Sequence, residues 1–243
     1  MIIDGNVLNS RAALQAMIDG LAKTPLLAQP GTRWSYSIAV DVQGYLVEKL
    51  SGQPFADFLR TRLFDPLGMK DTAFYVPKEK AGRLARLHRD GTDGKRTAPD
   101  DLPSDLSTPP AGPSGGGGLY STADDYLRFA QMLLNGGEFA GRRYLSPRTV
   151  QMMRTNHLQA EPLKTMRPGT GWGLGVRVVM DAAAAGEAVS DGSFDWYGIG
   201  GTWFWVDPVT DLTFVGMIQQ WNGRTTAEIQ GLSRNLVYQA LIN

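Results

Sequence analysis

The sequence predicts an α+β fold, with helices first and an antiparallel sheet with a covering helix last. Apolar residues recur at three- and four-residue spacing through the first part, as on one face of a helix. From Gly171 they alternate with smaller or polar residues, as in strands. Helical spacing returns over residues 225–243. We therefore expect a mainly helical subdomain at residues 1–165, and strands with a C-terminal helix at 166–243, within one domain.

The helical part shows recognisable start and stop signals. The first helix is expected at residues 11–23, after Asn9 and Ser10 as capping residues. The second helix is expected from Ile38 to Gly52, and the third from Phe55 until Pro66 stops that helix. A fourth is expected in "STADDYLRFAQMLLNGG" (121–137) with Ser121 as cap. A fifth is expected in "SPRTVQMM" (146–153), with Ser146 as cap and Pro147 in the first turn.

The strand-rich part begins with an alternating stretch from Trp172 to Met180. The segment "GTWFWVDPVTDLTFVGMIQQ" (201–220) predicts two strands joined by an Asp-Pro-Val-Thr-Asp turn, which pair as an antiparallel hairpin. The C-terminal helix can cover one face of that sheet. The segment 77–118 is rich in proline and glycine and is longer than a simple loop in a compact domain. We expect a surface excursion bordering a site there, with a small hairpin at "RLHRDGTDGK" (86–95).

Composition limits the kinds of partner. Lys plus Arg equals Asp plus Glu at 24 each, so no net charge attracts the chain to nucleic acid or an anionic membrane. Without cysteine and with only two histidines, a thiolate or His-rich metal site is excluded, and no cofactor is expected. No apolar run reaches the length of a membrane-spanning helix. No signal-peptide pattern is visible, which favours a cytoplasmic location.

Four ordered segments carry a family resemblance. They are "PGTRWSYS…GYLVEKLSGQPFADFLRTRLFDPLGMKDTAFYV", "GGGGLYSTADDYLRFAQMLLNGG", "GWGLGV" and "WYGIGGTWFWVDP". In this order they resemble the serine β-lactamase and penicillin-binding-protein superfamily, most closely class C β-lactamases and family VIII carboxylesterases. The resemblance implies a β-lactamase/transpeptidase-like fold, represented by its helical subdomain and the C-terminal part of its antiparallel sheet.

The resemblance also implies acyl transfer through a serine activated within a Ser-x-x-Lys motif. Tyr36 occupies the position of the family's tyrosine, which moves the proton to the leaving group when nearby positive charge favours its phenolate. Lactamases often carry Tyr-x-Asn, whereas this chain has Tyr36-Ser37-Ile38. The missing amide favours small esters as substrates, with β-lactam hydrolysis as a secondary activity.

The third family motif aligns with Trp196-Tyr197-Gly198, followed by Ile199. By family role the Ile199 N–H is one oxyanion donor, and the nucleophile's own N–H is the other. Tyr197 stands where the esterases mostly carry glycine. Glycines in and after this motif would let substrate approach the strand, although a bulge or tight turn explains them equally well. The mechanism requires Tyr36, Gly198 and Ile199 to meet in one cleft.

The nucleophile is missing from these 243 residues, because no serine is followed three residues later by lysine. Thr92 and Lys95 have the spacing but lie in a polar, glycine-rich turn. We therefore expect that the chain lacks an N-terminal portion, is inactive alone, and associates with itself or with the missing fragment through an unpaired sheet edge. The alternatives left open are a non-catalytic remnant, an interaction module, or one half of a split enzyme.

One serine matches a different hydrolase motif. "GPSGG" (112–116) satisfies Gly-x-Ser-x-Gly at Ser114, but no apolar strand precedes it and no helix follows directly. His88 and His157 are interpreted as surface or structural groups rather than as its catalytic base. Tryptophans 172, 203 and 205 are interpreted as core or pocket-wall residues before any role as a substrate platform.

Overall fold

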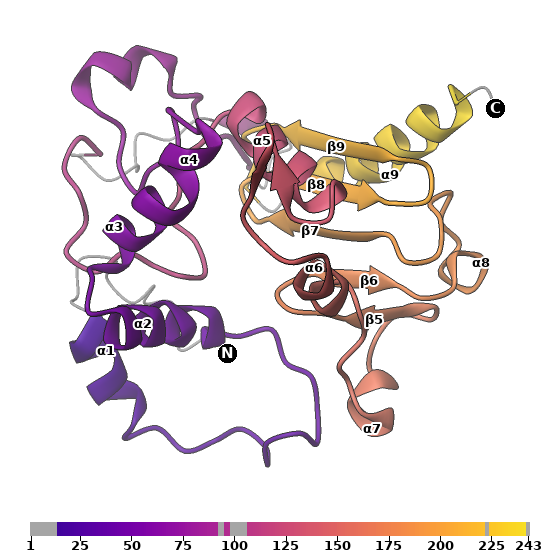
Figure 1. Cartoon of the computed structure of the whole chain (residues 1–243), viewed down its shortest axis with the longest axis horizontal. Coiled ribbons are helices and arrows are strands. Elements are labelled where there is room, and N and C mark those ends of the chain that lie inside the picture. The colour runs from indigo at the N-terminus through magenta and orange to yellow at the C-terminus, as the bar shows by residue number, and fades with distance from the viewer. Residues whose placement is uncertain (1–13, 92–94, 98–105, 222–223, 242–243) are drawn as a thin grey trace. The chain divides into compact units, whose positions relative to one another are not determined.

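The computed structural model divides into two compact units (Figure 1). The structure describes residues 14–91, 95–97, 106–221 and 224–241. Unit 1 is Met1–Leu84 with Pro103–Asp125, and unit 2 is Ala85–Leu102 with Tyr126–Asn243. This division follows contacts, whereas the expected boundary at residue 165 follows a change of sequence spacing. The rings of Tyr126 and Phe204 lie 5.2 Å apart, which explains why most of the helix that begins at Ala123 belongs with the sheet.

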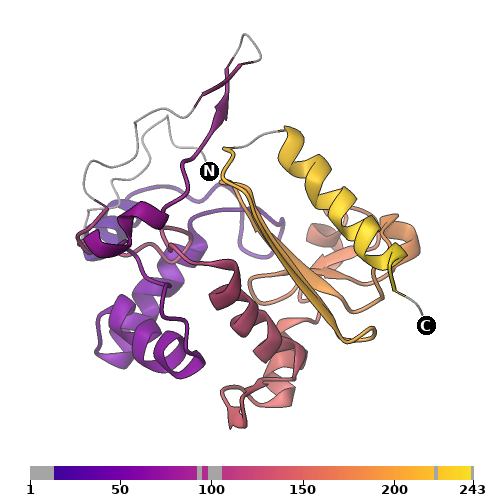
Figure 2. The same ribbon diagram turned by 90° about the horizontal axis from the view of Figure 1, so that it is seen from above.

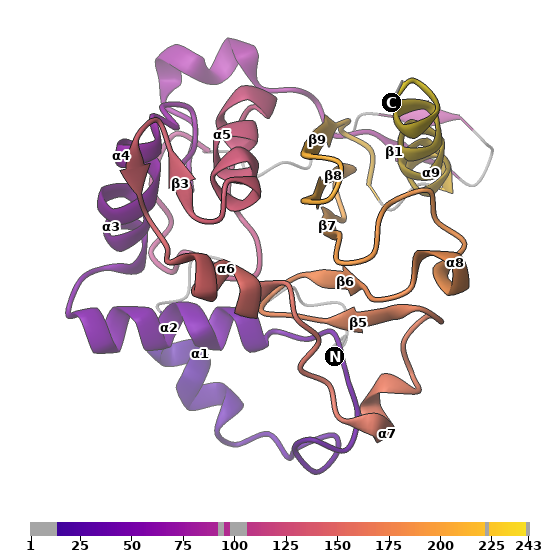
Figure 3. The same ribbon diagram turned by 45° about the vertical axis from the view of Figure 1, so that its right-hand side comes forward.

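Unit 1 is helical, as the spacing predicts (Figure 3). Its elements are α1 (Leu14–Leu21), α2 (Ala39–Ser51), α3 (Phe55–Leu59), the π-helical turn η1 (Arg60–Phe64), α4 (Asp65–Leu67), the 3-10 turn η2 (Lys78–Arg83) and the first residues of α5 (Ala123–Leu134). The expected caps Asn9 and Ser10 lie outside the described residues, as does the start of the 11–23 segment. Buried Leu14, Phe55 and Phe74 form the core between α1, α2 and α3.

Helix α2 ends where the sequence predicts. Gly52 adopts the left-handed conformation at φ 66°, and its N–H donates to the Glu48 carbonyl oxygen. The Glu48 carboxylate accepts a hydrogen bond from the Phe55 N–H at 3.0 Å, which ties the end of α2 to the start of α3.

The prediction that Pro66 stops the next helix is wrong. The Asp65 N–H donates to the carbonyl oxygen of Arg60, five residues back, so the chain passes through a wide π turn. Pro66 then lies in the first turn of α4, where a missing N–H costs nothing. The helical segment ends instead at Gly68, which is left-handed at φ 72°.

The expected cap of α5 is wrong by one residue. Thr122, not Ser121, accepts the hydrogen bond from the Asp125 N–H, at 3.2 Å. The Ser121 hydroxyl instead pairs with the Thr72 hydroxyl at 2.8 Å, a contact 49 positions away in sequence. Sequence spacing alone did not distinguish these two neighbouring hydroxyl groups.

The long excursion contains a small hairpin that overlaps the predicted one at 86–95, with its second strand just beyond that segment. Strand β1 (Arg89–Asp90) pairs antiparallel with β2 (Arg96–Thr97). His88, just before β1, forms a parallel bridge with Gln220, and the Trp221 N–H donates to the His88 carbonyl oxygen at 2.8 Å. This bridge attaches the hairpin to unit 2.

Unit 2 contains an antiparallel sheet of five strands in sequence order. They are β5 (Thr170–Trp172), β6 (Arg177–Val179), β7 (Phe194–Gly198), β8 (Thr202–Asp207) and β9 (Leu212–Met217). The predicted 201–220 hairpin is confirmed as β8 and β9. The alternating stretch from Trp172 to Met180 is not one strand, because a turn closed by the Gly173 N–H and the Val176 carbonyl oxygen divides it. The shorter elements of unit 2 are β3 (Glu138–Phe139), β4 (Arg142–Arg143), α6 (Pro147–Met153), α7 (Ala160–Leu163) and α8 (Ala182–Ala185).

Helices cover both faces of this sheet. Figure 2 shows α9 (Arg224–Gln239) along one face and α5 along the other. The Arg234 guanidinium on α9 lies 5.2 Å from the centre of the Trp205 ring. Trp203 and Trp205 are buried, as the sequence predicts for core residues. None of the described helices is long and apolar enough to span a membrane.

Candidate functional site

Tyr36 lies at the beginning of α2, in unit 1. The Ser37 hydroxyl oxygen accepts a hydrogen bond from the Ala39 N–H at 3.2 Å, and Ile38 stands at the N-cap position. This local bonding holds the Tyr36-Ser37-Ile38 segment against the first turn of the helix. The Tyr36 side chain is 57% exposed, so it is not a core packing residue. An exposed phenol at a fixed helix start fits a residue that acts on a ligand.

A glycine-rich loop covers the same turn of α2. A Cβ on Gly115 would lie 2.3 Å from the Val40 carbonyl oxygen, and one on Gly116 would lie 2.7 Å from a carboxylate oxygen of Asp41. Only glycine permits such a close approach. The loop therefore braces the helix start that carries Tyr36.

Ser114 has a structural partner rather than a catalytic one. Its hydroxyl donates to the Asp41 carboxylate at 2.5 Å, and the residues around it form bends and turns rather than a strand. The His157 ring nitrogen Nε2 contacts the Met152 carbonyl oxygen at 2.8 Å. A nucleophile elbow needs a strand before the serine and a histidine beside it. These contacts favour the structural interpretation of Ser114.

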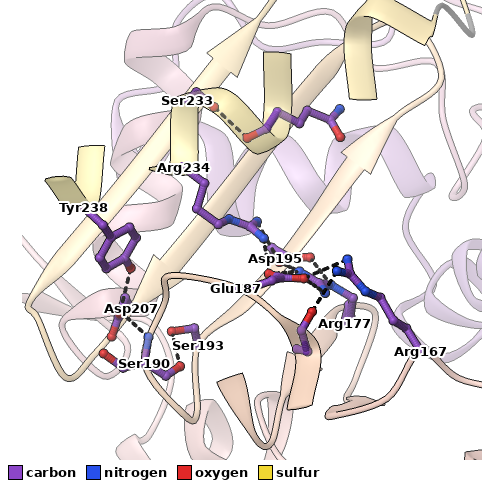
Figure 4. Close-up of polar contacts among 12 residues, drawn as sticks. Arg167, Arg177, Glu187, Ser190, Ser193, Asp195, Asp207, Ser233, Arg234 and Tyr238 are labelled. Atoms are coloured by element: carbon purple, nitrogen blue, oxygen red, sulfur yellow. Dashed lines mark hydrogen bonds and ion pairs between the residues drawn. The ribbon is translucent and has the colours of Figure 1, made fainter. Parts of the chain in front are cut away.

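The second candidate region is β7, in unit 2, whose first half is held by buried charges (Figure 4). Asp195 on β7 accepts hydrogen bonds from Arg177 on β6, at 2.9 Å to Nε, and from Arg234 on α9, at 2.9 Å. Glu187 accepts from the same two arginines, with 2.6 Å to Arg177 Nη1. We call Arg177, Glu187, Asp195 and Arg234 the buried ion cluster. It binds two strands, a loop and the C-terminal helix together.

The cluster shifts the pKa values of Glu187 and Arg177. Burial alone would raise the pKa of Glu187, but the Arg177 hydrogen bond and the charges of Arg177, Arg234 and Arg167 outweigh it, so the pKa is lowered. Burial alone would lower the pKa of Arg177, but its bonds to Asp195 and Glu187 raise it. Both shifts favour the charged forms of Glu187 and Arg177, so their ion pair holds the start of β7.

The sequence did not signal this cluster, because its members are far apart along the chain. Arg177 and Asp195 are 18 positions apart, and Arg234 and Asp195 are 39 apart. An acidic residue within a strand indicated a solvent-facing position more readily than a buried one. Only the register of β6 against β7 brings these charges together.

The second half of β7 is open on one side. All five residues of β7 pair with β8, but only Phe194 and Asp195 pair with β6. The β5–β6 hairpin turns back at residues 173–176, so among the described strands only β8 pairs with Tyr197 and Gly198. A strand with one free side can bind an extended ligand through its backbone.

Ile199 follows this open half within a tight turn. The Gly201 N–H donates to the Gly198 carbonyl oxygen at 3.0 Å, so a tight turn is present at these glycines. Gly201 is left-handed at φ 92°, and a Cβ on Gly198 would lie 2.6 Å from the Thr202 hydroxyl. Among the described residues, no acceptor lies within hydrogen-bond range of the Ile199 N–H. The turn therefore presents a backbone donor beside the open strand.

The structure thus gathers Trp196, Tyr197, Gly198 and Ile199 on one strand end of unit 2, and Tyr36, Ser37 and Ile38 on one helix start of unit 1. The convergence of Tyr36 with Gly198 and Ile199 stays a prediction. No described part of the chain contains a group of three or more His, Cys, Asp or Glu residues that could hold a metal ion.

Comparison with known proteins matches most of the sequence to one family. A family model described as "Beta-lactamase" matches residues 4–238. Protein Rv1367c of Mycobacterium tuberculosis is 40% identical over 82% of this chain and 52% of its own length. Esterase EstB of Burkholderia gladioli is 32% identical over 79% of this chain and 51% of its own length.

A solved structure agrees with this match. EstCE1, described as a hydrolase with promiscuous acyltransferase activity, superimposes with a TM-score of 0.80 at 27% identity, over 93% of this chain and 62% of EstCE1. The chain spans about half the length of the curated relatives it matches. The predicted β-lactamase-like fold is confirmed, as is the resemblance to esterases of that fold.

Proposed function

The chain belongs to the β-lactamase family, and on that basis we propose that it is part of a serine hydrolase that cleaves small carboxylic esters through an acyl-enzyme. The observation that carries this proposal is the open half of β7 followed by the unpartnered Ile199 N–H among the described residues. A fixed N–H beside a strand that can receive substrate is what stabilises the negative charge of a tetrahedral intermediate.

Each residue has a role in the proposed reaction. The serine oxygen attacks the ester carbonyl, and the carbonyl oxygen becomes an oxyanion that accepts a hydrogen bond from the Ile199 N–H. The Tyr36 oxygen, beside the lysine that a Ser-x-x-Lys segment would supply, accepts the serine proton and passes it to the departing alcohol. Water then attacks the acyl-enzyme by the same route in reverse. No metal or cofactor takes part in this scheme.

Esters are the proposed substrates because of what surrounds Tyr36. Ile38 stands where lactamases often carry an asparagine, so the amide that holds a β-lactam side chain is missing. The names of EstB, an esterase, and EstCE1, a hydrolase with promiscuous acyltransferase activity, support the same substrate class. We propose β-lactam hydrolysis as a weak secondary activity.

We further propose that a segment outside these 243 residues supplies the nucleophile. No serine in the sequence is followed three residues later by lysine. The outer edge of β9 is a candidate pairing edge, because among the described residues β9 pairs only with β8 and its sequence LTFVGM has no charge or proline. The chain alone should therefore form oligomers as its concentration rises, measured by light scattering, and a segment that covers this edge should suppress them.

A serine-directed fluorophosphonate probe tests the proposal, with intact-mass spectrometry as readout. The 243-residue chain alone should remain unlabelled, since no acyl-enzyme can form without the nucleophile. A polypeptide that also contains the Ser-x-x-Lys segment should be labelled once, on that serine. Stoichiometric labelling of the chain alone that disappears in Ser114→Ala would show that the nucleophile lies within it.

Turnover by the polypeptide with the Ser-x-x-Lys segment tests the role of Tyr36. Tyr36→Phe should lower kcat by about two to four orders of magnitude, the usual range for a lost acid–base group. Tyr45→Phe is a matched control in α2, because it removes only an exposed hydrogen bond to Gln15 and should leave kcat unchanged. Efficient cephalosporin hydrolysis with poor aryl-ester hydrolysis would reverse the substrate assignment.

Labelling of a serine also distinguishes an enzyme from a non-catalytic interaction module. If the polypeptide with a Ser-x-x-Lys segment neither takes the probe nor cleaves esters, a non-catalytic interaction module is the better description. The absence of a nucleophile from this sequence is the observation that favours that rival.

A further inference from the structure

Three aromatic rings pack against one another at the open end of β7. The Trp196 ring meets the Trp172 ring edge-on, with centroids 4.6 Å apart at 85°. The Tyr197 ring stacks on Trp196, with centroids 4.7 Å apart at 29°. Trp172 comes from β5 and the other two from β7, so two strands hold the stack. We call these three residues the aromatic stack.

The outermost ring of the stack faces solvent. Tyr197 is 55% exposed, although one of its faces lies against Trp196. Ile199, two residues later, is also 55% exposed and adds aliphatic surface. Neither side chain contributes to the buried core of unit 2. A rigid, supported aromatic face left in water is typical of a binding surface rather than of packing.

The charges nearby indicate which aromatic ligand fits. Arg177 and Arg234, the two arginines that hold Asp195 at the start of β7, are both bonded to Asp195 and Glu187 in the buried ion cluster. They are committed to these carboxylates, so they are poor anchors for a ligand phosphate. A neutral flat group needs no such anchor and fits the exposed Tyr197 ring.

We propose that Tyr197 determines specificity by stacking on a neutral, flat aromatic group of the substrate, beside the ester carbonyl that the Ile199 N–H would bind. This inference rests on the proposed esterase function and adds the class of substrate. Stacking contributes beyond simple burial of area, by an amount that corresponds to about a 2- to 12-fold difference in affinity. An aromatic ligand should bind more tightly than its saturated counterpart by this factor.

The test uses a pair of ketones, 2-acetonaphthone and the matching acetyl-decahydronaphthalene, which contain no ester bond that the enzyme could cleave. Their dissociation constants are measured on the 243-residue chain by NMR, with ¹³C-labelled tyrosine rings reporting the location. The aromatic ketone should bind about 2- to 12-fold more tightly and should shift the Tyr197 ring signals, assigned by their loss in Tyr197→Phe. Tyr197→Phe should keep the preference, because the phenyl face remains.

Tyr197→Leu should abolish the preference while retaining apolar area. Trp221→Leu is the control, because Trp221 is an exposed aromatic residue of unit 2 outside the stack. Equal binding of the two ketones, a preference that survives Tyr197→Leu, or unshifted Tyr197 signals would overturn the inference. Because no bond is cleaved, these outcomes leave the esterase proposal intact, and failure of probe labelling contradicts that proposal without altering ketone binding.

Discussion

The two halves of β7 differ in almost every physical respect. Phe194 and Asp195 are buried, paired with strands on both sides, and fixed by the ion cluster. Tyr197 is exposed, and among the described strands Tyr197 and Gly198 pair with β8 alone. The first half is built for stability, and the second leaves backbone and ring surface available. One short strand therefore carries both its own anchor and a candidate binding edge.

This contrast shows how an open strand end can remain ordered. An unpaired strand edge normally loses hydrogen bonds and ordering. Here Arg177 and Arg234 hold the strand directly before the open half, and Trp203 of β8 pairs with Tyr197 across it. Rigid support next to an open edge is what a preorganised site requires.

Breaking the anchor should have the largest effect. Asp195→Asn should lower the free energy of unfolding by about 3–5 kcal/mol, because two buried arginines lose a charged partner. Urea denaturation followed by circular dichroism measures the loss. Asp57→Asn is the control, since its pair with Arg60 is exposed and its removal should change stability little. Equal, small losses in both variants would show that the ion cluster does not anchor β7.

The second-largest effect is expected from removing the Ile199 N–H, the backbone donor that follows the open half of β7. Ile199→Pro deletes the N–H yet suits the second position of its turn, where proline is favoured. In the polypeptide that supplies the nucleophile, kcat should fall by about 100- to 1,000-fold with the fold retained. Ile199→Ala keeps the N–H and should keep most of kcat. Comparable losses in both variants would assign the effect to the side chain rather than to the backbone donor.

A substitution at Gly216 on β9 can disturb Trp203 on β8, the strand that pairs with the open half of β7. A Cβ on Gly216 would lie 2.2 Å from the Trp203 ring, and Trp203 is the register partner of Tyr197. Gly216→Ala should cost about 1–3 kcal/mol of unfolding free energy through overpacking. Gly231→Ala, in α9 with nothing within 4 Å, should stabilise the chain slightly. Melting temperatures that move in the same direction for both variants would contradict this.

Acidification should lower the free energy of unfolding through Glu187, a member of the buried ion cluster. The lowered pKa of Glu187 means that its ionised form stabilises the fold above the ordinary glutamate pKa, about 4.3, and that this contribution disappears as pH falls through the lowered value. Unfolding free energy should therefore decline below about pH 4.5, measured by urea titration at several pH values. Glu187→Gln should flatten this slope. An unchanged slope in Glu187→Gln would assign the acid sensitivity to other carboxyl groups, such as Asp207. Burial alone would raise the pKa of Asp207, but hydrogen bonds from the Tyr238 hydroxyl and from backbone N–H groups lower it.

The smallest effect on stability is expected at Tyr197. Tyr197→Leu should change the free energy of unfolding by no more than about 0.5 kcal/mol, because the side chain is exposed and outside the core. The same urea experiment measures it beside Asp195→Asn. A large loss would mean that the aromatic stack supports the fold rather than a ligand.

Local signals in the sequence predicted most of the elements. Gly52 ends α2, Ser146 caps α6, and the turn after Asp207 joins β8 to β9, because each depends on residues only a few positions apart. The roles of Tyr36 and Ile199 were assigned by resemblance and stay predictions. The errors at Pro66 and Ser121 arose where a π turn and a distant threonine changed the local outcome.

The sequence by itself therefore determined the class of fold, the main helices, the terminal hairpin and the family, since periodicity, caps and turn chemistry are local properties. Tertiary structure decided which charges are buried together, which face of Tyr197 is supported, and which half of β7 is open. Those features depend on strand register and on where the β5–β6 hairpin turns back, and both are set by contacts between residues far apart in the chain.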